Sequence, residues 1–175
     1  MARSRPLLAS RLAPPLAALL LGACAALGPP PVAGSPVAGG GSRYAVGKLL
    51  LELPPGWTAR GDDRRLSAGD ARGLGRVEVQ RAEPPYRGEE ECLARAEDAL
   101  QRGAASATNV RLHPTTFAGR KGVALEADQG PWHGWAWGVC DGAVQYRISF
   151  FGATPLDPEV LAAFRALSQG ARFEP

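Results

Sequence analysis

The sequence predicts an α+β domain in which helices flank an antiparallel β-sheet. Two segments have the period of amphipathic helices, one in the middle of the chain and one near its end. Most other segments alternate apolar and polar residues as strands do, and the dipeptide Asp141-Gly142 between two of the longest is typical of a hairpin. Strands, helix, antiparallel strands and helix in this order are typical of the α+β class.

The first predicted strands precede the first helix. GKLLLELP, Gly47 to Pro54, is an apolar run that ends at a Pro-Pro-Gly turn. A charged, glycine-rich stretch follows, in which a short strand is expected at residues 65–67. RVEVQRAE, residues 76–83, alternates strictly, so Val77 and Val79 are expected to face the core.

The first helix is predicted from Glu89 to Arg102, with acids in its first turn and Gly103 as its stop. The run of three glutamates at residues 89–91 complements the helix dipole, because consecutive helical residues point in directions too different to converge on one metal ion. One narrow face carries mostly small residues, which suits close packing on a sheet. Its members are Cys92, Leu93, Ala96, Ala99, Leu100 and Gly103.

Several strands and a final helix complete the prediction. Strand-like pieces are expected at residues 109–113, 115–117 and 120–128, and a hairpin at residues 132–140 and 143–152. In the final helix Asp157 is the expected N-cap, Pro158 takes the first helical position and Gly170 marks the end. The apolar face of this helix contains Val160, Leu161, Phe164 and Leu167.

The hairpin has two possible registers. If the loop is Asp141-Gly142 alone, Trp135, Trp137 and Val139 share a face with Val144, Tyr146 and Ile148. A type I turn with a G1 bulge would instead place the aromatic residues opposite Gln145 and Arg147. The register decides whether the tryptophans belong to the core or to the surface.

The order of elements resembles a known family. A strand that ends in PPGW, an amphipathic helix, a T-x-F-x-G-R-K-G segment before a strand, a hairpin strand YRISFFG and a final helix are similar to the PsbP-like α/β/α sandwich, which also occurs in DcrB-type bacterial lipoproteins. The similarity covers residues 44–173 and implies the fold. No residue matches a family motif with an assigned role, so the resemblance implies no functional residue.

The N-terminus has the order of a secretory signal. Arginines at positions 3, 5 and 11 precede a short apolar run, which is too short for a permanent membrane helix. Leu21, Gly22, Ala23 and Cys24 resemble the lipobox of bacterial lipoproteins, which implies a signal peptide over residues 1–23 and a lipid on Cys24. The alternative is an ordinary signal peptide cut before Ala25, with Cys24 in place by chance.

Residues 24–43 are rich in Gly and Pro and nearly free of charge, which predicts a disordered tether before a single domain at residues 44–175. Removal of the signal leaves 17 of the 20 basic residues, which equals the 17 acidic ones. The mature chain is therefore formally neutral, and nucleic acid is excluded as a partner.

Two further cysteines, Cys92 and Cys140, are expected to form a disulfide in an oxidising compartment, with two buried thiols as the alternative. These cysteines with His113 and His133 could supply four zinc ligands, but their spacing matches no zinc motif, and no metal or cofactor is expected.

A cluster within PWHGWAWG is the remaining candidate site. Trp132, His133, Trp135 and Trp137 would form a site for a small ligand or a glycan if they were exposed. The alternation of Trp135 and Trp137 with small residues favours the sheet core instead.

The expected function is that of an envelope lipoprotein with a non-enzymatic binding or scaffold domain, whose partner is an envelope protein or a small ligand. Ligand or glycan binding by the tryptophans is the alternative, and a hydrolytic enzyme comes third. The lipid would hold the protein to a membrane. Ala25 is not the aspartate that retains lipoproteins of this class at the inner membrane, so the resemblance implies the outer membrane, facing the periplasm.

Overall fold

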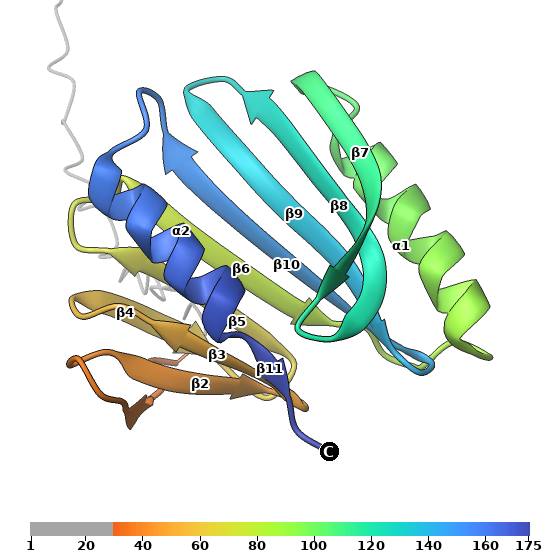
Figure 1. Ribbon diagram of the computed structural model, residues 1–175, viewed down its shortest axis with the longest axis horizontal. Helices are drawn as coiled ribbons and strands as arrows, with labels where there is room; N and C mark the ends of the chain where they lie inside the picture. The colour runs from red at the N-terminus through yellow and green to blue at the C-terminus, as the bar shows by residue number, and fades with distance from the viewer. Residues whose placement is uncertain (1–29) are drawn as a thin grey trace, which may run out of the picture.

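The computed structural model describes residues 30–175, which form two antiparallel sheets and two helices (Figure 1). The predicted signal peptide, residues 1–23, and Cys24 lie outside the described residues. No helix within residues 30–175 has the length and apolar character that crossing a bilayer requires. The predicted α+β class is confirmed.

The large sheet has seven strands and the small sheet four. The large sheet runs in the order β4 (Trp57–Gly61), β5 (Arg65–Asp70), β6 (Gly75–Arg81), β10 (Val144–Ala153), β9 (Trp132–Asp141), β8 (Arg120–Gln129) and β7 (Thr108–Phe117). The small sheet consists of β1 (Ser35–Pro36), β2 (Ser42–Val46), β3 (Leu49–Leu53) and β11 (Arg172–Phe173). The helices are α1 (Glu89–Gly103) and α2 (Pro158–Gly170).

The two helices cover opposite faces of the large sheet. Helix α1 packs on β8, β9 and β10, whereas α2 packs on β10 and also contacts β3 of the small sheet (Figure 1). The main core lies between the large sheet, α2 and the small sheet. Its largest fully buried side chains are Tyr146, Phe150, Leu49, Leu51, Ile148 and Leu167.

The layer under α1 is thinner, because small residues face each other there. Cys92 and Ala96 on the helix are fully buried, and Gly138 of β9 lies directly below Ala96. Of the small-residue face predicted for this helix, Cys92, Ala96 and Leu100 are buried against the sheet, as expected, whereas Gly103 at the helix end is exposed.

The hairpin of β9 and β10 turns at Gly142 and Ala143, with Asp141 opposite Val144. Gly142 has a φ of 60°, and glycine at the first of two turn residues is the pattern of a type II′ turn. Trp137 consequently lies opposite Ile148. The prediction that Trp135, Trp137 and Val139 share a face with Val144, Tyr146 and Ile148 is confirmed. The turn itself lies one residue later than the predicted Asp141-Gly142. The alternative register with a G1 bulge is wrong.

Both helices match their predicted bounds to within one residue. The carboxylate of Asp157 accepts hydrogen bonds from the backbone N–H groups of Glu159 and Val160, at 2.8 and 3.4 Å, so the predicted N-cap is confirmed. The predicted pieces at 109–113 and 115–117 form one strand, β7, because a proline at position 114 is tolerated in an edge strand.

The predicted disordered tether, residues 24–43, is wrong for its described part. Val32 donates a backbone hydrogen bond to Ala59, and Gly61 donates one to Pro30, so residues 30–32 lie along the edge of β4. Val32 packs against the core, and Gly34 faces the ring of Tyr44 without room for a side chain. These contacts offset the entropy of ordering the chain, which composition alone does not reveal.

Candidate functional site

The four residues of the predicted tryptophan site do not form one exposed cluster. Strand alternation in β9 places Trp132 on the side of α1, and Trp135 and Trp137 on the side of α2. The rings of Trp135 and Trp137 stack on Phe164 of α2, at centroid distances of 4.3 and 5.7 Å. Trp137 is 9% exposed and belongs to the core. The core interpretation is therefore confirmed for Trp137, which takes no part in an exposed cluster, whereas Trp132, His133 and Trp135 are half-buried.

His133 lies at the rim of this aromatic group, where two carboxylates contact it. Its Nδ1 is 2.6 Å from Asp128, its Nε2 is 3.2 Å from Glu126, and its ring meets Trp135 edge-on. A hydrogen bond from Asn109, followed by the one with His133, lowers the pKa of Asp128. These contacts hold the imidazole in place and occupy both of its nitrogen atoms.

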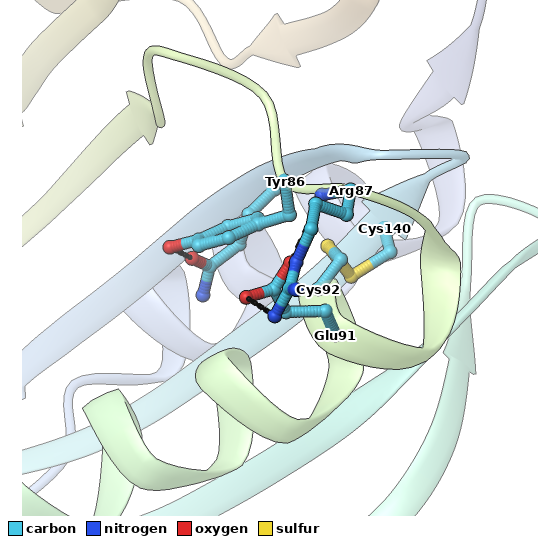
Figure 2. The surroundings of a disulfide bond; sticks show 6 residues. Tyr86, Arg87, Glu91, Cys92 and Cys140 are labelled. Carbon is cyan, nitrogen blue, oxygen red and sulfur yellow. Dashed lines mark hydrogen bonds and ion pairs between the residues drawn. A yellow bond between two sulfur atoms is a disulfide. The ribbon is translucent and has the colours of Figure 1, made fainter.

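The predicted disulfide between Cys92 and Cys140 is present and joins α1 to β9, with a Cα–Cα distance of 6.1 Å (Figure 2). Both cysteines are fully buried. The bond removes them from the four-residue zinc combination with His113 and His133. Within residues 30–175, no group of three or more His, Cys, Asp or Glu side chains is arranged to hold a metal ion.

The chain before α1 is fixed beside the disulfide (Figure 2). Tyr86 donates a hydrogen bond of 3.0 Å to the side chain of Gln145, a buried polar residue. Arg87 forms an ion pair of 3.0 Å with Glu91, and this contact lowers the pKa of Glu91. The residues around the disulfide therefore hold the chain before α1 in place.

Part of one face of the large sheet is not covered by a helix. The sequence did not predict this surface as a candidate site. Helix α1 covers β8, β9 and part of β10, whereas the same side of β4, β5 and β6 carries exposed polar residues. We call this surface, together with the adjoining side of β10, the open face. A cavity of about 200 Å³ lies where the open face meets α1 and is lined by Ala99, Gly103, Glu78, Arg147 and Phe151, among others.

Arg147 occupies the centre of the open face. It lines the cavity beside α1 and two neighbouring hollows, one toward β5 and one toward Tyr86. Its guanidinium donates a hydrogen bond of 3.0 Å to the side chain of Gln80 on β6. The alternation of residues 76–83 predicted which side chains of β6 point outward, but no local signal shows that a helix leaves them uncovered.

Comparison with known proteins defines the fold class. No protein-family model matches the sequence, and no curated protein does. The chain is similar to the solution structure of cyanobacterial PsbP (CyanoP) from Synechocystis sp. PCC 6803, with a TM-score of 0.55 and 13% identity over 85% of this chain and 99% of that one.

A crystal structure from Bacteroides thetaiotaomicron VPI-5482 is also similar, with a TM-score of 0.50 and 9% identity over 75% of this chain. This chain spans about half of that protein, 47% of its length. At such identities the likeness concerns the fold alone. The chain therefore has a PsbP-like α+β fold, as the sequence predicted.

Proposed function

We propose that this chain is a lipid-anchored protein of the bacterial cell envelope, whose PsbP-like domain is a non-enzymatic binding or scaffold module. The observation that carries the proposal is the bond between Cys92 and Cys140. Disulfides persist in oxidising compartments, and this one uses two of the three cysteines. The third, Cys24, stands in the lipobox Leu21-Gly22-Ala23-Cys24, where the resemblance to lipoproteins implies a lipid.

The docking of residues 30–32 on β4 supports a position close to the membrane. Five residues separate Cys24 from Pro30, and the extended chain between these two positions spans at most about 20 Å. Pro30 is held at Gly61, the end of β4 that leads into the turn to β5. A lipid on Cys24 would therefore hold the domain with its β4–β5 turn toward the bilayer. We propose the outer membrane, facing the periplasm, as the location.

The surroundings of His133 support a non-enzymatic role. Both ring nitrogens contact carboxylates, so neither is directed at a hydroxyl or thiol nucleophile. Cys92 and Cys140 are bonded to each other and do not act as nucleophiles. A second candidate function, the binding of a ligand, is favoured by the open face rather than by the tryptophans.

Metabolic labelling with a palmitate analogue tests the anchor. The wild-type protein should take up the label and fractionate with membranes, whereas Cys24→Ser should lose both properties. The matched control is the double variant Cys92→Ser/Cys140→Ser, which should keep the label. Label on Cys24→Ser would contradict the anchor, and alkylation of Cys92 or Cys140 in the unreduced, denatured protein would remove the support for an oxidising compartment.

A further inference from the structure

The open face carries an excess of positive charge that the whole chain does not have. Strand alternation places Arg60, Arg65, Arg76 and Arg147 on this face with a single acidic strand residue, Glu78. We call these five residues the arginine face. The formally neutral mature chain thus has a charge asymmetry that appears only when four strands lie side by side.

The arginines are arranged in neighbouring cross-strand rows. Arg65 pairs with Gln80, and Gln80 pairs with Arg147, so the two arginines lie two strands apart, about 10 Å. The next row begins with Arg60 and continues through Ser67 and Glu78 to Ser149. Hydroxyl and amide side chains therefore lie between the cations.

The cations of this face have few close ion pairs, and the nearest acid outside its strands is Asp62 in the β4–β5 turn, beside Arg65. The ion pair that joins two of its members, Arg76 and Glu78, has a distance of 3.8 Å, and Arg147 bonds to the neutral Gln80. By contrast, Arg43 and Arg120, outside this face, have carboxylate partners at 2.6 and 2.7 Å. An anion that settles on the arginine face would therefore displace few existing contacts.

One of the cations is held in a defined orientation. The guanidinium of Arg76 lies over the ring of Phe151 at 4.8 Å and over that of Trp132 at 5.5 Å. Stacking of this kind restricts the guanidinium plane and leaves its N–H groups available for a carboxylate. The face of β9 that carries Trp132 thus contributes to the surface, although Trp135 and Trp137 do not.

We propose that the arginine face binds an acidic polysaccharide, a chain of sugar units that bear carboxylates. The cations are spread over several rows on a shallow surface, which fits an extended ligand with repeated anionic groups better than a single small anion. Sugar hydroxyls would pair with Ser67, Ser149 and Gln80, whose hydroxyl and amide groups lie in the rows between the cations. The proposal deepens the proposed function and rests on it, because it names the ligand of that binding module.

Calorimetric titration of the full mature chain with polygalacturonate at low salt tests the proposal, because it measures the binding affinity. The double variant Arg65→Gln/Arg147→Gln should bind about a hundredfold more weakly, since it removes two charge-assisted hydrogen bonds that each contribute roughly a factor of ten or more. Glu78→Gln should bind more tightly, because it removes the carboxylate among the arginines. The matched control is Arg111→Gln/Arg165→Gln, which removes the same charge from exposed positions on β7 and α2 and should bind as the wild type does.

Equal losses in the two double variants would overturn the proposal, because they would reflect net charge rather than this surface. Tighter binding of inorganic phosphate, of polyglutamate or of vesicles that contain phosphatidylglycerol would overturn the choice of a polysaccharide. Circular dichroism of each variant excludes misfolding as a cause of lost binding. The titration does not require the lipid, so a failure of the anchor on Cys24 would be seen in the labelling experiment and not here.

Discussion

Gly138 of β9 lies so close to Ala96 of α1 that a Cβ atom on the glycine would stand 2.8 Å from the Cβ of the alanine. The same strand carries Cys140, and the same helix carries Cys92 one turn earlier, so this contact and the disulfide hold the helix at one distance from the sheet. The small residues under α1 are therefore a requirement of its position rather than a neutral feature of composition.

Gly138→Ala should destabilise the protein by about 1–3 kcal/mol, because the added methyl group has no space between strand and helix. Urea unfolding measures the change in the free energy of unfolding. Gly103→Ala is the matched control, since a Cβ at Gly103 meets nothing within 4 Å and alanine favours the helix. Equal effects of the two substitutions would contradict the close packing under α1.

Reduction of the disulfide should lower the free energy of unfolding by about 4 kcal/mol, the chain-entropy value for a loop closed by cysteines 48 positions apart. Both sulfur atoms are buried, so a reductant should act mainly on the unfolded state. Thermal unfolding with and without dithiothreitol measures the effect. Cys92→Ser/Cys140→Ser should not respond to the reductant, and a wild-type protein equally indifferent to it would contradict the bond.

Asp157 should stabilise the start of α2 in a pH-dependent manner. An ion pair with Arg72, followed by the backbone N–H of Glu159, lowers the pKa of its carboxyl in the folded protein. The stabilisation is therefore present above the unfolded pKa, about 4, and is lost as the pH falls through the lower folded pKa. Asp157→Ala should melt at a lower temperature at pH 7.

The difference in melting temperature between the wild type and Asp157→Ala should shrink below about pH 4. Asp157→Asn separates the two contributions, because asparagine can still cap the helix but carries no charge for Arg72. It should melt above the alanine variant and below the wild type at pH 7. A difference that stays constant down to pH 2 would show that the carboxylate charge has no part in the effect.

Phe164→Ala should expose Trp135 and Trp137 and lower the free energy of unfolding by about 2–4 kcal/mol, because the ring packs against both of them. Their fluorescence should shift to longer wavelength and become more sensitive to acrylamide. Arg165→Ala, the next residue on the exposed side of α2, is the control and should change neither property. Unchanged quenching in Phe164→Ala would contradict the buried stack.

The docked segment predicts a fixed orientation of the lipidated protein on a vesicle. A fluorophore on Asp63→Cys, at the β4–β5 turn, should transfer energy to labelled lipid headgroups more efficiently than one on Gln129→Cys, at the opposite end of the strands. A flexible insertion of about fifteen residues between Ala26 and Leu27 should remove most of the difference. Equal transfer from both sites in the lipidated protein would mean that residues 30–32 do not hold the domain in this way.

Several residues of the candidate site could be predicted one by one from the sequence, but their assembly into one surface could not. The sequence identified the alternation that turns Arg76, Glu78 and Gln80 outward, and it identified the two cysteines as candidates for a bond. It missed β4, whose WTARG has few apolar residues because one side of this strand faces solvent. Without β4 and β5 beside β6, the arginines of four strands do not appear as one surface.

The sequence by itself determined the helices, the N-cap of α2, most strands and most of the small-residue face of α1, because these depend on the spacing of neighbouring residues. Only the tertiary structure decided the register at Gly142, the burial of Trp137 and the docking of residues 30–32 on β4. The tertiary structure also decided that α1 lies over β8, β9 and β10, which sets the extent of the open face. These features depend on contacts between segments that are distant in the sequence. Such contacts form when the buried area outweighs the loss of chain entropy, and no local sequence pattern predicts that balance.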